Sequence, residues 1–209
     1  DSDAQVPYTD FSIHGGPEED PYYTEGRNPL ACRETIMIPW NDFNILEETF
    51  NKYHDIIAGI HFEGIVWNHE GLYPKPGFVE KIRELCTKYN IVMCMDEVIT
   101  GFRVNIGGAQ TVLGVIPDLC TMGKAMSNGI PVSCVGGKKE IMDCIRGNKV
   151  LVPGTYPGYG LGMAAVLATL DELTKDNCAV YDRVFKVQEK IMNGLVEISN
   201  KYGISLTIT

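Results

Sequence analysis

Short apolar runs alternate with amphipathic stretches along most of the chain. Residues 91–95 and 119–122 are apolar runs bounded by Asp, Asn, Gly or Pro, which predicts buried strands. Residues 56–60 and 62–66 predict a further buried strand. Between these runs, apolar side chains at helical spacing predict a helix over residues 77–89. A helix between strands is typical of parallel βαβ units, so the pattern predicts an α/β fold.

The pattern continues on both sides of this core. Before it, Asp42 is a candidate cap for a helix with an apolar stripe made of Phe43, Leu46, Phe50 and Tyr53. After it, the spacing predicts one strand and three helices, in the order 132–135, 139–146, 161–173 and 181–202. Residues 204–209 are predicted to begin another strand.

Residues 1–33 are polar and rich in Pro, Gly and Tyr, which predicts a long irregular loop. A loop of this length at a terminus is unusual for a complete domain. We therefore expect the sequence to be a fragment of a longer chain.

Composition excludes several classes of function. The net charge of −9 argues against a nucleic-acid partner, and no run of 18 apolar residues predicts a membrane-spanning helix. The seven cysteines are scattered without a CxxC pair, and the histidines lack ligand spacing such as HExxH. We therefore expect neither a disulfide framework nor a metal site, and the reduced thiols indicate a cytoplasmic protein.

An acid and a lysine stand at the ends of two predicted strands. Asp96 follows the run at 91–95, and Lys124 follows the run at 119–122. In open α/β sheets, chemistry takes place beyond the carboxyl ends of the strands. We therefore expect both side chains at the functional edge of the sheet.

The sequence around these two residues resembles that of a known enzyme family. Residues 96–103 read DEVITGFR, and residues 121–124 read TMGK before the turn Ser127-Asn128-Gly129. Together these motifs resemble the class-III aminotransferases, fold type I enzymes that use pyridoxal 5′-phosphate (PLP), and most of all their glutamate-1-semialdehyde aminomutase branch. The resemblance extends from about Trp40 to the end of the chain. It implies a three-layer α-β-α sandwich with a mainly parallel sheet.

The resemblance assigns the central role to Lys124. The amine of a lysine forms a Schiff base with an aldehyde, and PLP is such an aldehyde. The freed lysine would then move the α-proton between the substrate and the cofactor. The alternative is a surface lysine that follows a strand.

Asp96 and Val98 are the expected partners of the cofactor ring. A carboxylate at Asp96 would keep the pyridine nitrogen protonated, and Val98, on the same face, would pack on the ring. The alternatives are a turn cap for Asp96 and core packing for Val98. Glu97 points to the opposite face, which favours a structural role.

Two further residues are implied by the resemblance alone. Thr155, in a Gly/Pro-rich loop, matches a threonine that binds the cofactor phosphate of the neighbouring subunit, which implies a homodimer with shared active sites. Asn68 matches an asparagine near the ring hydroxyl. A loop residue without a ligand is the alternative for Thr155, and a turn-forming asparagine is the alternative for Asn68.

The resemblance also divides the chain and suggests its reaction. It implies a lead-in loop at 1–35, a PLP-binding core at 36–175, and a helix and strand at 176–209 that lead into a small domain. The implied function is amino-group transfer between small-molecule amino and carbonyl compounds. The alternatives are a glutamate-1-semialdehyde 2,1-aminomutase reaction, a non-catalytic α/β binding module and an inert fragment.

Two positions favour the aminomutase branch over ornithine-type enzymes. The latter usually carry a glutamine where this chain has Ile99 and a glutamate where it has Asn68. The side chain of Ile99 cannot form a hydrogen bond with the ring hydroxyl, whereas that of Asn68 can.

Overall fold

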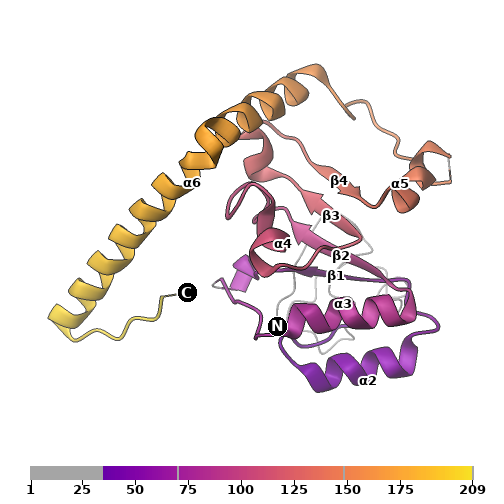
Figure 1. Ribbon diagram of the computed structural model, residues 1–209, viewed down its shortest axis with the longest axis horizontal. Helices are drawn as coiled ribbons and strands as arrows, with labels where there is room; N and C mark the ends of the chain where they lie inside the picture. The colour runs from indigo at the N-terminus through magenta and orange to yellow at the C-terminus, as the bar shows by residue number, and fades with distance from the viewer. Residues whose placement is uncertain (1–34, 70, 148, 209) are drawn as a thin grey trace, which may run out of the picture. The chain divides into compact units, whose positions relative to one another are not determined.

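The computed structural model describes residues 35–69, 71–147 and 149–208 (Figure 1). The long loop that we expect over residues 1–33 lies outside the described residues. The chain divides into two compact units, and the boundary between them follows Met93. Among the described residues, no helix combines the length and apolar character needed to cross a bilayer.

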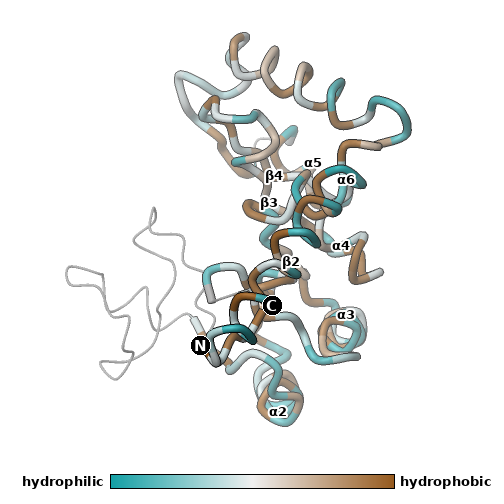
Figure 2. Tube along the Cα trace, turned by 90° about the vertical axis from the view of Figure 1, so that its left-hand side faces the viewer, coloured by the Kyte–Doolittle hydropathy of each residue, from teal (hydrophilic) through white to brown (hydrophobic). Residues whose placement is uncertain are grey.

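The described part of the first unit contains two amphipathic helices and one complete strand. They are α2 (Phe43–Tyr53), β1 (Gly59–Glu63) and α3 (Phe78–Tyr89), with a short 3-10 turn, η1 (Trp67–His69), after the strand. The predicted cap is confirmed, because the Asp42 carboxylate accepts hydrogen bonds from the backbone N–H groups of residues 44 and 45. Hydrophobic and polar residues alternate around the turns of α2 and α3 (Figure 2). Their apolar sides are buried, with Phe50, Phe78 and Ile82 at most 2% exposed.

The first strand is shorter than the sequence predicts. We expect buried strand from residue 56 onward, yet Ile56 is 71% exposed and β1 begins only at Gly59. After Glu63 the chain stays buried but leaves the strand, and Val66 makes an isolated bridge with Leu72. The apolar run 62–66 therefore predicts correctly which residues are buried but not where the strand ends.

The second unit holds the remaining strands and helices. Strand β2 (Val92–Glu97) spans the boundary between the units, and the elements after it are α4 (Gly108–Leu113), β3 (Leu119–Met122), η2 (Lys124–Ser127), β4 (Cys134–Gly137), α5 (Lys139–Arg146) and α6 (Gly160–Tyr202). The strand order is β1-β2-β3-β4. Strands β2 and β3 are parallel, whereas β4 is antiparallel to β3. The fold is therefore α/β, as predicted, with a mixed sheet.

Helix α6 consists of two helical segments. Residues Lys175 to Cys178 have non-helical backbone angles, which matches the break that the sequence predicts between 173 and 181. The second segment leaves its apolar stripe open, with Val187 54% and Ile191 58% exposed. The strand predicted from residue 204 is wrong, because residues 204–208 have no regular secondary structure.

A buried carboxylate joins β2 to α4. Glu97 is 0% exposed, and its oxygens accept hydrogen bonds from the Thr100 hydroxyl and, at 2.8 Å each, from the backbone N–H groups of Ala109 and Gln110. Gly108 allows this approach, because a Cβ there would lie 2.5 Å from Glu97 Oε2 and its φ is +74°. Glu97 is therefore structural, in agreement with the face that the sequence assigns to it.

Replacing Glu97 with glutamine tests this connection. Glutamine keeps the size of the side chain but replaces one carboxylate oxygen with an NH₂ group. This donor would face backbone N–H groups that also donate. In the full-length protein, we expect Glu97→Gln to lower the free energy of unfolding by about 2 kcal/mol in urea denaturation. The control, Glu189→Gln, changes an exposed residue of α6 and should have little effect. Equal unfolding midpoints for the two variants would contradict the structural role.

Candidate functional site

The register of β2 and β3 places their carboxyl ends side by side. Asp96 is paired with Thr121 and Glu97 with Met122, and the two strands are parallel. Lys124 follows Met122 after a single residue, Gly123. The structure therefore brings Asp96 and Lys124 to the same edge of the sheet, as the sequence predicts.

Asp96 is a buried carboxylate fixed by the backbone. It is 8% exposed, and its Oδ1 accepts a hydrogen bond from the N–H of Val98 at 2.8 Å. The neighbouring thiol responds to this environment: burial, and after it the negative charge of Asp96, raises the pKa of Cys94 to about 11. Cys94 therefore stays a neutral thiol near pH 7.

Val98 links the end of β2 to the lysine turn. Its side chain is half-buried, and its Cγ1 lies 3.7 Å from the position that a Cβ would take at Gly123. Val98 therefore packs against the residue that precedes Lys124. This places an apolar surface next to the amine-bearing turn.

Lys124 lies in a strained turn. It is the first residue of η2, its side chain is exposed, and its φ of +43° is in the left-handed region that non-glycine residues seldom adopt. The turn is held around it by the Met126 N–H, which donates to the Gly123 carbonyl, and by the Ser127 hydroxyl, which donates to the Ile130 carbonyl. Strain of this kind is frequent at functional sites. No ion pair of the described residues involves Lys124.

A buried hydroxyl next to Asp96 indicates that the site suits a polar ligand. Thr121 Oγ1 is inaccessible to solvent and has no hydrogen-bond partner among the described residues. Directly paired residues of neighbouring strands project to the same face, so Thr121 shares the face of Asp96. An amine, a carboxylate, an apolar wall and an unused hydroxyl fit an aldehyde-bearing pyridine ring such as that of PLP. Among the described residues, no cluster of side chains suits a metal ion.

The other two predicted residues belong to other segments of the chain. Thr155 is exposed in the irregular segment between α5 and α6. Asn68 belongs to the first unit, where its Nδ2 donates to Glu63 Oε1 at 2.5 Å. The structure thus brings Asp96, Val98 and Lys124 to the neighbouring ends of β2 and β3.

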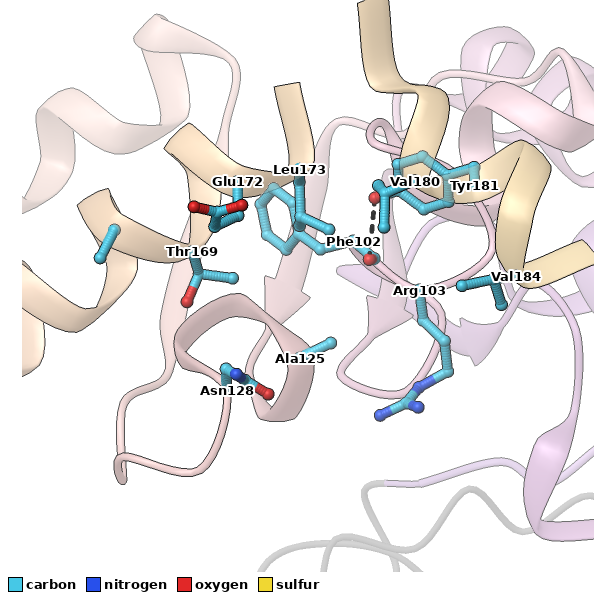
Figure 3. Close-up of a pocket in the computed structure, with 11 residues that line it drawn as sticks. Phe102, Arg103, Ala125, Asn128, Thr169, Glu172, Leu173, Val180, Tyr181 and Val184 are labelled. Atoms are coloured by element: carbon cyan, nitrogen blue, oxygen red, sulfur yellow. Dashed lines mark hydrogen bonds between the residues drawn. The ribbon is translucent and has the colours of Figure 1, made fainter. Parts of the chain in front are cut away.

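A separate pocket of about 540 Å³ lies beside the turn that follows Lys124 (Figure 3). Ala125 and Asn128 line it from that turn, and both helical segments of α6 complete its wall. Within it the Tyr181 hydroxyl donates to the Phe102 carbonyl at 2.9 Å, the contact dashed in Figure 3. None of the predicted site residues lines this pocket, so it is distinct from the candidate site.

Two further polar residues, one in each unit, are not singled out by sequence reasoning. Thr121 stands in the TMGK motif, and strand alternation with a correct register would have placed it beside Asp96. Glu63 is buried at the end of β1 and holds Asn68. Its signal is weaker, because a glutamate five residues before an asparagine has no fixed geometry outside a regular helix.

Comparison with known proteins identifies relatives of this chain. Over 182 residues the chain is 39% identical to a glutamate-1-semialdehyde 2,1-aminomutase of Natranaerobius thermophilus. The matched region covers 86% of this chain and 42% of that protein. It is also 39% identical to glutamate-1-semialdehyde 2,1-aminomutase 2 of Brevibacillus brevis, over 85% of this chain and 41% of the relative. The chain thus spans about two fifths of the length of these relatives.

The fold has a counterpart among solved structures. An omega-transaminase of Sphaerobacter thermophilus matches with a TM-score of 0.81 and 30% identity, over 90% of this chain and 44% of that one. Residues 28–207 match the family described as aminotransferase class-III. Because that match covers most of the chain, including both strand ends of the candidate site, the chain belongs to the class-III aminotransferases.

Proposed function

We propose that this chain supplies the lysine and the pyridine-binding carboxylate of a PLP-dependent enzyme that transfers amino groups between small molecules. The observation that carries the proposal is the parallel register of β2 and β3, which supports a shared site for Asp96, in β2, and Lys124, two residues after β3. Membership of the class-III aminotransferases supports the same chemistry. The proposed division of the chain is a core over 36–175 and a segment over 176–209 that leads into a small domain.

Each residue of the site has a distinct task in this proposal. PLP, when bound, supplies an aldehyde and an electron-accepting ring. The Nζ of Lys124 would hold the cofactor through its aldehyde carbon, with loss of water, and once a substrate amine has displaced it, the free Nζ would accept the α-proton of the substrate and donate it to the cofactor carbon. The Asp96 carboxylate holds a proton on the ring nitrogen, and the side chain of Val98 covers one face of the ring. Asn68 contacts the ring hydroxyl.

The cellular location and the assembly are also part of the proposal. No disulfide joins the described cysteines to one another, which supports a cytoplasmic protein. The active unit is a homodimer in which Thr155 of one subunit binds the cofactor phosphate of the other. An isologous dimer is the commonest form of oligomer. The exposure of Thr155 and its distance in sequence from the other site residues support this arrangement.

A 2,1-aminomutase reaction is the second candidate function. Two relatives that are 39% identical carry that name, and Asn68 and Ile99 follow the pattern of that branch. In this reaction the amino group moves between adjacent carbons of one molecule instead of passing to a second one. The residues around Lys124 serve both reactions, so the substrate decides between them.

A substrate panel on the full-length protein separates these reactions. We expect turnover of glutamate-1-semialdehyde or of α-amino donors, because Asn68 and Ile99 replace the polar pair of ornithine-type enzymes. Product analysis by mass spectrometry distinguishes rearrangement from transfer to an acceptor. A clear preference for ornithine or 4-aminobutyrate would show that Asn68 and Ile99 do not determine the branch.

Asp96→Asn tests the role of the buried carboxylate. Asparagine preserves the size of the side chain but cannot hold a positive charge on the ring nitrogen. We expect turnover to fall roughly a thousandfold, equivalent to about 4 kcal/mol of transition-state stabilisation. The control, Asp171→Asn, alters an exposed aspartate of α6 and should retain full turnover. Matching rates for both variants would refute the proposed role of Asp96.

Mixing two inactive variants tests whether the sites are shared. Lys124→Ala removes the amine, and Thr155→Asp places a negative charge against the phosphate. If each site combines Lys124 of one subunit with Thr155 of the other, a mixed dimer has one intact site and one doubly altered site. Random association in equal amounts should then restore about a quarter of the wild-type activity. If both residues come from the same subunit, mixing restores none, and sedimentation as an active monomer would likewise contradict the proposal.

A further inference from the structure

Asn68 is held by a buried carboxylate five residues earlier in the chain. Glu63, the last residue of β1, is 5% exposed. Its Oε1 accepts a hydrogen bond from Asn68 Nδ2 at 2.5 Å, and its Oε2 accepts one from the backbone N–H of Trp67 at 3.0 Å. Both oxygens therefore hold the same short turn, η1, in which Asn68 is the central residue.

This carboxylate decides which way the Asn68 amide faces. An amide can rotate by half a turn and exchange its donor and acceptor ends, but a carboxylate offers only acceptors. Rotation would place the amide oxygen of Asn68 against a buried, negatively charged Glu63 and lose a charge-assisted hydrogen bond. The Asn68 amide is thus fixed with its nitrogen toward Glu63, while the residue itself is exposed.

We propose that Glu63 is a positioning residue for the cofactor, acting through Asn68. This inference rests on the proposed function, in which the Asn68 amide contacts the ring hydroxyl of PLP. Glu63 itself does not touch the ligand in this arrangement. It sets the orientation in which Asn68 presents its remaining amide atoms, and the charge of Glu63 polarises the amide so that its oxygen is a stronger acceptor.

A double-mutant cycle on PLP affinity tests the inference. In the full-length protein, PLP binding is titrated for wild type, Glu63→Gln, Asn68→Ala and the double variant. Glutamine at position 63 keeps the shape of the side chain but can form a hydrogen bond with either the nitrogen or the oxygen of the Asn68 amide. Because the amide orientation is then no longer fixed, we expect Glu63→Gln to weaken PLP binding about tenfold. In the Asn68→Ala background the same change should have little further effect on PLP affinity, because the amide through which Glu63 acts on the cofactor is then absent.

Additional variants make the result independent of folding losses. Glu48→Gln changes an exposed residue of α2 and should bind PLP like wild type. Glu63→Asp keeps the charge but withdraws it by one methylene, so it should also weaken binding if Glu63→Gln does not fold. In protein without PLP, hydrogen exchange at the Trp67 N–H should be faster in Glu63→Gln, because its bond to Glu63 is altered.

The possible outcomes separate this inference from the proposed function. Equal losses from Glu63→Gln in both backgrounds would show a general structural effect and overturn the positioning role alone. Wild-type affinity in Asn68→Ala would overturn the role of Asn68 and the inference with it. Failure of the wild-type protein to bind PLP would overturn the proposed function itself.

Discussion

The parallel pairing of β2 with β3 is the constraint on which the candidate site depends. The pairs Asp96 with Thr121 and Glu97 with Met122 bring the two strands to an end at the same level. A lysine 28 residues after Asp96 in sequence therefore stands at the same edge. A slip of one residue in this register would turn Thr121 away from the face of Asp96. The site thus depends on a backbone arrangement before it depends on any single side chain.

Strand alternation gives two adjacent acids different functions. Asp96 faces the site and has one oxygen fixed by the Val98 N–H. Glu97 faces the other way, where it is fully buried and accepts the N–H groups at the start of α4. The structural acid holds the chain that follows β2, and this leaves the neighbouring acid at the sheet edge. A similar arrangement recurs in the first unit, where buried Glu63 holds the exposed Asn68.

Local patterns predicted most of the fold but not its long-range contacts. Amphipathic spacing predicted α2, α3 and the break in α6, because burial on one face repeats every helical turn. Apolar runs did not predict where a strand begins, since Ile56 belongs to an apolar run but is exposed. They also did not predict strand direction, since the sequence of β4 does not show that it is antiparallel to β3. For the site, the motifs predicted Asp96 and Lys124. The positive φ of Lys124 depends on contacts made by later residues, which spacing does not show.

Locating PLP on the chain tests the central claim most directly. The full-length protein would be incubated with PLP, reduced with borohydride, digested and analysed by mass spectrometry. The proposed site requires a pyridoxyl phosphate group on Nζ of Lys124 and no stoichiometric labelling in Lys124→Ala, with Lys186→Ala, an exposed lysine of α6, as control. We expect labelling at Lys124 alone. Stoichiometric labelling of another lysine, or unchanged labelling in Lys124→Ala, would contradict the assignment of this turn as the cofactor-binding site.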